Sequence, residues 1–266
     1  MPNPLTKILN KIKRITQWAP KANKLDHLVT IGTSYGGWTI PDNFLTEQSI
    51  CYLAGAGEDI SFDVGLVEKF KCHVFTIDPT PRAKKHFEKL MSDVDNNTRT
   101  LSTNNNKKDY YNLSPENKEK LTFIELGLWD SKDELKFFSP QNPDHVSHSA
   151  VNLQNTQDYF LANVDRLSSI MKEQHHKEID LLKIDIEGAE YNVLKSLIED
   201  NITPKILCIE YDEMHSPIDK NYLVRVKQSI EDLIEYGYVL VFSDQSLNCT
   251  FVFKEHYLEL TNNKLS

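Results

Sequence analysis

The sequence predicts an α/β protein whose mostly parallel β-sheet is covered by helices on both faces. Short apolar runs alternate with segments of helical periodicity, the pattern of buried parallel strands joined by crossover helices. Several runs end in acidic residues or glycine, and the carboxyl ends of such strands face the ligand crevice of an open sheet. The most informative run is 181–184, because the acidic segment 185–187 and Gly188 follow it, ahead of a helical pattern.

The elements follow in order from this alternation. A lead-in contains a strand at 27–31 and a short helix opened by Pro41, since proline is favoured at the first helical position. The core starts at Ser49. Strands are expected at 50–54, 73–77, 121–124, 181–184 and 206–209, with an antiparallel hairpin of 238–242 and 249–253 at one sheet edge.

The segments between these strands are expected to differ in character. Helical spacing of apolar residues predicts helices after the first, second, fourth and fifth strands, the last over 219–236, and a further helix over 156–172. The polar segment 92–119 predicts an exposed, mobile insertion, and 126–138 a β-ribbon with its turn at 130–133. The long loop 139–152 is of the kind that often carries function.

Length and charge limit the class of protein. With 266 residues, one large domain at 49–258 is the simplest expectation, preceded by an extension at 1–48. The formal net charge of −9 argues against nucleic acid as a partner, because affinity for DNA or RNA rests on neutralising phosphates. That charge suits a neutral or cationic substrate.

Cysteine usage and hydropathy indicate a cytoplasmic protein. The four cysteines, at positions 51, 72, 208 and 249, have no Cys-x-x-Cys spacing and lie in or beside apolar runs, as expected of buried, reduced thiols. No segment resembles a signal peptide or a membrane span. Residues 4–18 read as an amphipathic helix that packs on the domain or on a partner subunit of a homo-oligomer, with an anionic membrane surface as the alternative.

A cofactor signature follows the first strand. Gly55, Ala56 and Gly57 form a turn that opens a helix, and Asp78 ends the second strand, where a carboxylate can accept ribose hydroxyl hydrogens. Ile60 stands where a dinucleotide-binding turn has its third glycine. The acidic residues 58–59 would repel a pyrophosphate, whereas they would attract the cationic cofactor S-adenosylmethionine.

Three motifs give the chain a resemblance to the FkbM family of S-adenosylmethionine-dependent methyltransferases, in its methyltransferase-like branch. They are segments 52–63, 78–82 and 183–190, and the last is the most specific. The resemblance implies a class I methyltransferase fold: a Rossmann-like, three-layer sandwich whose seven-stranded sheet has an antiparallel last strand. It also implies O-methylation of a hydroxyl on a sugar, glycan or related small molecule.

The resemblance also implies roles for individual residues. By position in the family's motifs, the methionine end of the cofactor would contact Gly55, Ala56, Gly57 and Glu58, and its ribose would contact Asp78 and Pro79. The adenine would lie near Gly127 and Leu128, and the methyl group would face Asp185. One departure is that the family's usual acidic residue within the first strand is missing. Carboxylates of the turn, at Glu58, Asp59 or Asp63, would substitute for it.

Candidate bases are needed because an aliphatic hydroxyl is a poor nucleophile. Asp185 and Glu187 come first, then Glu210 with Asp212, then His148 with His145 on the long loop. Structural roles compete with each assignment: Glu187 orienting Asp185, Glu210 binding a lysine, and the histidines making loop hydrogen bonds. Asp185, Glu187 and Glu210 could instead share a divalent cation through oxygen ligands, although the resemblance requires no metal.

Three other functions compete with O-methylation. A nucleotide-sugar glycosyltransferase would use Asp185 and Glu187 as an Asp-x-Glu metal site, but the glycine turn and Asp78 speak against it. An NAD-dependent enzyme is disfavoured by Ile60. A non-catalytic S-adenosylmethionine-binding module would keep the fold and lose the reaction. The absence of an Asn-Pro-Pro-Tyr motif after the fourth strand favours an oxygen acceptor over a nucleobase amine.

Overall fold

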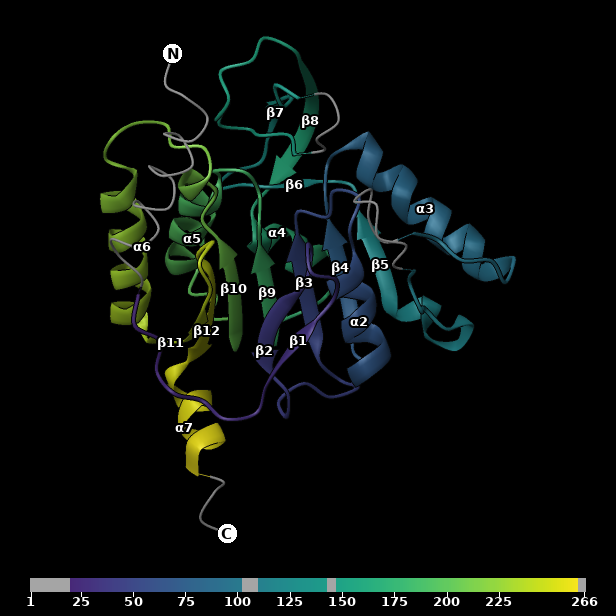
Figure 1. Ribbon diagram of the computed structural model, residues 1–266, viewed down its shortest axis with the longest axis horizontal. Helices are drawn as coiled ribbons and strands as arrows, with labels where there is room; N and C mark the ends of the chain where they lie inside the picture. Colours follow the sequence, from purple (N-terminus) through teal and green to yellow (C-terminus); the bar gives the residue numbers. More distant parts are fainter. Residues whose placement is uncertain (1–19, 102–109, 143–146, 263–266) are drawn as a thin grey trace, which may run out of the picture.

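A seven-stranded sheet forms the centre of the computed structural model, which describes residues 20–101, 110–142 and 147–262 (Figure 1). Its strand order is β11-β12-β10-β9-β3-β4-β5. β12 is antiparallel to both neighbours and the other pairs are parallel, so the α/β class is confirmed with a mixed sheet. The strands are β3 (Ile50–Ala54), β4 (His73–Ile77), β5 (Leu121–Ile124), β9 (Leu181–Ile184), β10 (Ile206–Glu210), β11 (Tyr238–Ser243) and β12 (Asn248–Phe253).

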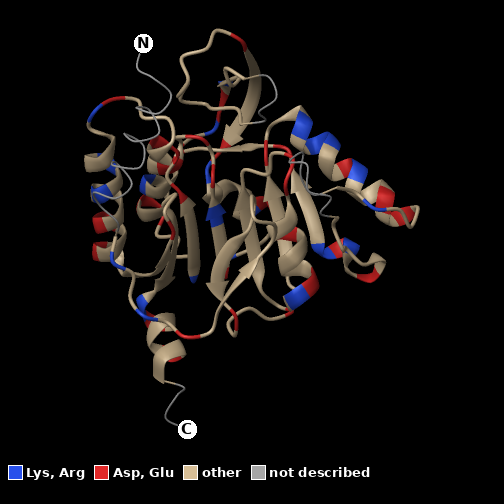
Figure 2. Cartoon of the chain, in the orientation of Figure 1, with Lys and Arg blue, Asp and Glu red and all other residues tan. Residues whose placement is uncertain are grey.

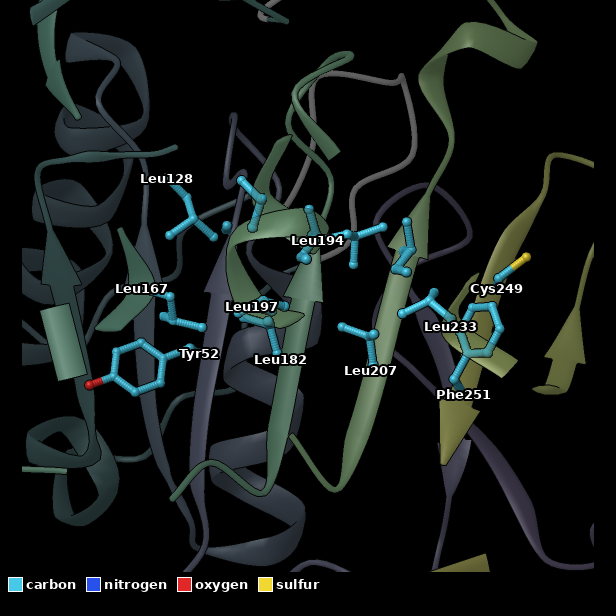
Figure 3. Packing of buried hydrophobic residues seen from close by; sticks show 14 of the residues in the cluster. Tyr52, Leu128, Leu167, Leu182, Leu194, Leu197, Leu207, Leu233, Cys249 and Phe251 are labelled. Carbon is cyan, nitrogen blue, oxygen red and sulfur yellow. The ribbon is translucent and has the colours of Figure 1, made fainter. Parts of the chain in front are cut away.

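Helices cover both faces because side chains alternate along the buried strands. Cys51 and Leu53 of β3 pack with α2 and α3, whereas Tyr52 and Ala54 pack with α4, α5 and α6. Figure 3 shows the second cluster, with Leu182 and Leu207 of the sheet beside Leu194 and Leu197. The helices are α2 (Ser61–Phe70), α3 (Pro81–Asp95), α4 (Leu167–Glu173), α5 (Glu190–Glu199), α6 (Tyr222–Tyr236) and α7 (Lys254–Asn262).

The strand order reverses between β3 and β9, which places a crevice at their carboxyl ends. From β3 the chain proceeds outward to β4 and β5, and from β9 it proceeds the other way to β10. Gly55 and Asp185 flank this switch point, where open α/β sheets bind ligands. Gly55 has φ +87°, and a Cβ added to it would lie 1.7 Å from the Asp185 carbonyl oxygen. The approach of the two strand ends therefore requires glycine.

A three-stranded sheet lies beyond the carboxyl edge of the main sheet (Figure 1). Its strands show that two of the sequence predictions are wrong. Its order is β6 (Gly127–Leu128), β8 (Tyr159–Asp165), β7 (Asp133–Phe138). The predicted helix over 156–172 is wrong, because Phe160, Ala162 and Val164 alternate inward with the period of a strand and only 167–173 is helical. The predicted ribbon is also wrong, since β7 pairs with β8 instead of with β6.

The lead-in forms a β-hairpin of β1 (Leu28–Ile31) and β2 (Trp38–Pro41). The strand at 27–31 is thus confirmed, but Pro41 ends a strand and opens no helix. Trp38 and Ile40, two residues apart in β2, are both buried in the core that α2 also contributes to. This alternating burial favours a strand over a helix. Proline is tolerated at that strand end because β2 lies at an edge of its two-stranded sheet.

The described parts of segment 92–119, residues 92–101 and 110–119, contain more regular structure than predicted. α3 extends to Asp95, a 3₁₀-helix η1 spans Pro115–Lys120, and Tyr111 and Leu113 are buried. The Tyr111 hydroxyl accepts the Ile60 N–H at 2.9 Å, which ties this segment to the start of α2. Residues 102–109 and the predicted helix at 4–18 lie outside the described residues.

The four cysteines are buried free thiols, as predicted. Across the described ranges, no helix has both the length and the apolar character needed to cross a bilayer. The boundary between 1–48 and 49–258 stays a prediction.

Candidate active site

A cavity of about 450 Å³ lies at the carboxyl edge of the central strands, within the usual size range of ligand pockets. Every described residue of the proposed cofactor-binding and catalytic sets lines it. These residues are Gly55, Ala56, Gly57, Glu58, Asp78, Pro79, Gly127, Leu128, His148, Asp185, Glu187 and Glu210. His145 lies outside the described residues. The parallel strands bring these distant segments together because their carboxyl ends share one edge.

Asp78 holds the glycine turn. Its Oδ2 accepts the N–H groups of Ala56 at 2.8 Å and Gly57 at 3.1 Å, and its Oδ1 accepts the N–H and hydroxyl of Thr80 at 2.7 and 2.6 Å. Thr80 in turn caps α3 by accepting from Ala83 N–H. With four donors on one buried carboxylate, Asp78 shapes the turn as well as lining the cavity.

The three carboxylates expected to replace the missing acidic residue of strand one all have protein partners. Glu58 forms a two-bonded ion pair with Arg82, at 3.1 and 3.0 Å. Asp59 accepts the Thr33 hydroxyl at 2.7 Å and so ties the lead-in to the cavity wall. Burial raises the pKa of Asp63 to about 6, against the opposing hydrogen bond from Thr76.

Lys183 is a buried cation that the sequence reasoning missed. It projects from β9, and its Nζ lies 2.9 Å from Asp185 Oδ2 and 2.5 Å from the Gly55 carbonyl oxygen. Burial alone would lower the pKa of Lys183, but the charge of and hydrogen bond to Asp185 raise it above its usual value. A lysine inside an apolar strand was the available signal, because buried lysines are almost always paired.

Glu187 and Glu210 are carboxylates whose protons are held more tightly than usual. Burial and the neighbouring charges of Asp185 and Glu210 raise the pKa of Glu187 to about 7. Burial, followed by the charge of Asp185, also raises the pKa of Glu210, whose Oε1 lies 3.5 Å from His215 Nε2. A carboxylate with a pKa near 7 is matched to accept a proton at neutral pH.

Further residues of the wall come from loops that the sequence reasoning did not assign to the site. Tyr35 comes from the lead-in hairpin, Phe137 from β7, Asp244 from the β11–β12 turn and Asn248 from the start of β12. Asn248 Nδ2 donates to Asp244 Oδ2 at 2.9 Å, while its buried Oδ1 has no hydrogen-bond partner in the described part of the chain. That oxygen offers an acceptor for a ligand donor at this end of the cavity.

The cavity is acidic. Its lining includes Asp59, Asp63, Asp185, Glu187, Glu210, Asp212 and Asp244, against Lys183 as a buried cation. Figure 2 shows acidic segments gathered at the upper ends of the central strands. Low-dielectric walls concentrate this field, which favours a cationic ligand. Within the ranges that the structure describes, no three acidic, histidine or cysteine side chains converge to hold a metal ion.

The molecule is thus an α/β protein with an acidic cavity at its topological switch point. Residues 54–240, over half of the chain, match the methyltransferase FkbM domain model. The chain belongs to the FkbM methyltransferase family, as the three sequence motifs indicated. No curated protein matches the sequence.

Solved structures to which this chain is similar include two methyltransferases and a pre-rRNA processing protein. An FkbM methyltransferase from Methylobacillus flagellatus KT is 15% identical over 79% of this chain, with a TM-score of 0.46. This chain covers only 44% of that protein's length. An rRNA methylase from Streptococcus thermophilus is 9% identical, with a TM-score of 0.40, and the match covers 80% of this chain and 90% of that protein. The fibrillarin pre-rRNA processing protein of Methanococcus jannaschii is 11% identical, with a TM-score of 0.39. The match covers 88% of this chain and 86% of that protein.

Proposed function

We propose that this protein is an S-adenosylmethionine-dependent O-methyltransferase of class I fold, acting on a hydroxyl of a sugar, glycan or related small molecule. The observation that carries the proposal is an acidic cavity beside a glycine turn at the switch point of the sheet, in a chain that belongs to a methyltransferase family. Both the chemistry of the cavity and the family membership support the proposed cofactor and acceptor.

The residues of the cavity suit this cofactor. S-adenosylmethionine carries a sulfonium and an ammonium, which the carboxylate-rich lining favours. The turn 55–58 would hold its methionine end, Asp78 and Pro79 its ribose, and Gly127 and Leu128 its adenine, with Phe137 adding an apolar wall. When bound, the cofactor supplies an electrophilic methyl group on sulfur.

The chain's own residues would position the acceptor and take its proton. Asp185 is held by Lys183 at 2.9 Å, which fixes its direction at the crevice and leaves its other oxygen for a ligand. Glu187, with a pKa near 7, is the best-matched proton acceptor. Glu210 with His215 forms a second acid–base pair on the neighbouring strand end. His148 lines the cavity and packs against Phe160, and we propose that it contacts the acceptor instead of the cofactor.

The acceptor class follows from the same surface. Carboxylates and the free Asn248 oxygen accept hydrogen bonds, so they suit a ligand rich in hydroxyl or ammonium donors. Phosphate-bearing acceptors would meet like charge, which costs affinity. A neutral polyhydroxy acceptor therefore fits better than a nucleic acid.

Calorimetry tests the cofactor first. Titration with S-adenosylmethionine should give saturable binding. Neither UDP-glucose in the presence of Mn²⁺ nor, in a separate titration, NAD should bind. Binding of the UDP-sugar alone would reverse the assignment in favour of glycosyl transfer. A screen of sugars and glycans for formation of S-adenosylhomocysteine then tests the reaction. Cofactor binding with no methylated acceptor across a broad screen would favour a non-catalytic module.

A further inference from the structure

The turn between β9 and α5 has three consecutive backbone N–H groups, and all three donate to carboxylates. Ile186 and Gly188 donate to Glu190 Oε1, at 3.4 and 2.9 Å. Glu187 donates to Asp212 Oδ2 at 2.8 Å. Glu190 is the first residue of α5, and Asp212 follows β10, so two separate elements hold one turn.

The turn needs this support because of its conformation. Glu187 has φ +56° and Gly188 has φ +97°, two successive left-handed residues. Such a conformation is disfavoured for a residue with a side chain and persists only where its surroundings enforce it. Asp185 and Glu187 project from this segment into the cavity, so its backbone sets where both carboxylates point.

We propose that Glu190 and Asp212 are positioning residues, which hold the 186–188 turn and thereby direct Asp185 and Glu187 into the cavity. The consequence for binding and catalysis rests on the proposed function. Glu190 is fully buried and does not line the cavity, so it acts through the turn and not on a ligand.

The two positioning carboxyl groups accept neighbouring N–H groups of the same short turn and therefore lie close together, and two such groups stay close only if one keeps a proton. Burial raises the pKa of Glu190 to about 8 and that of Asp212 well above its usual range. The charges of Asp185 at the end of β9, of Glu187 in the turn and of Glu210 in β10 also act on the pair. Lys183 pairs with Asp185 and His215 with Glu210, so these cations are engaged by neighbouring carboxylates. Full ionisation of Glu190 and Asp212 above pH 8 would therefore push the two groups apart and loosen the turn.

Two variants of Glu190 separate positioning from bulk. Glu190→Gln keeps an oxygen for the turn and offers an amide donor to Asp212, so it needs no shared proton. Glu190→Ala removes the anchor. Between pH 7 and 9, the affinity for S-adenosylmethionine should fall at least fivefold more in the wild type than in Glu190→Gln. The titration of the ligand itself affects both proteins equally and therefore cancels in this comparison. Glu190→Ala should bind at least tenfold more weakly at pH 7. Equal affinities and equal pH profiles in all three proteins would overturn the proposal.

Amide hydrogen exchange reads the anchor without any ligand. Exchange at 186–188 should be at least tenfold faster in Glu190→Ala than in the wild type, with Glu190→Gln near the wild type and α6 unchanged. If the wild type failed to bind S-adenosylmethionine, the proposed function would fall while this comparison still decided the anchor. If Glu190→Ala does not fold, Asp212→Ala against Asp212→Asn gives the same comparison at Glu187. Unchanged exchange at the turn in the anchor-deleted variant would refute the positioning role.

Discussion

Asp78 offers the sharpest test of how the cofactor turn is built. Replacing it with asparagine keeps the shape of the side chain but leaves one acceptor oxygen. The carboxylate accepts four hydrogen bonds, two from Ala56 and Gly57 and two from Thr80, on separate oxygens. The amide can serve one pair and must turn its NH₂ group toward the donors of the other.

The magnitude follows from the two lost bonds. Hydrogen bonds to a charged group are worth about 1.5 kcal/mol each at the low end, so Asp78→Asn should destabilise the protein by about 3 kcal/mol. Loss of the ordered turn and of a ribose partner should weaken S-adenosylmethionine binding at least tenfold, about 1.4 kcal/mol.

Urea unfolding and calorimetry measure the two effects of Asp78→Asn. Glu125→Gln is the matched control: it removes the same charge from an exposed residue that pairs with Lys84 outside the cavity, and should cost under about 1 kcal/mol. If Asp78→Asn changed stability and affinity no more than Glu125→Gln does, the reasoning about this turn would be refuted.

Other predictions concern the acidic strand end. Asp185→Asn should cut turnover far more than cofactor affinity in a methyl-transfer assay; full activity would remove Asp185 from the mechanism. Lys183→Met should lower the free energy of unfolding by about 3 kcal/mol, because it leaves the Gly55 carbonyl and Asp185 without their buried partner; an unchanged urea midpoint would contradict this. Because Glu187 must lose its proton to act as base, activity should rise with pH through about 7. Glu187→Gln should lack that limb of the profile, and a retained limb would point to another base.

Much of the site was predictable because it depends on strand ends. Apolar runs mark parallel strands, and parallel strands place their carboxyl ends at one edge. Gly55, Asp78 and Asp185 follow three such runs, so their meeting in one cavity needed no knowledge of the loops. Lys183 was missed because a single polar residue in a strand does not show which face it takes or what lies there.

The remaining errors came from segments whose structure depends on distant partners. Leu161, Val164 and Leu167 have helical spacing, yet residues 159–165 pair with β7, and pairing overrides a weak local pattern. Asp244 and Asn248 reach the cavity only because β12 inserts next to β10. Nothing in their local sequence shows that insertion.

We propose that the acidic cavity at the switch point is the cofactor site. A crystal structure with S-adenosylhomocysteine tests it most directly. We expect the nucleoside beside Gly57 and Asp78 and the sulfur directed toward Asp185. Density for the ligand elsewhere on the protein, or a cavity that stays empty at saturating ligand, would contradict the account.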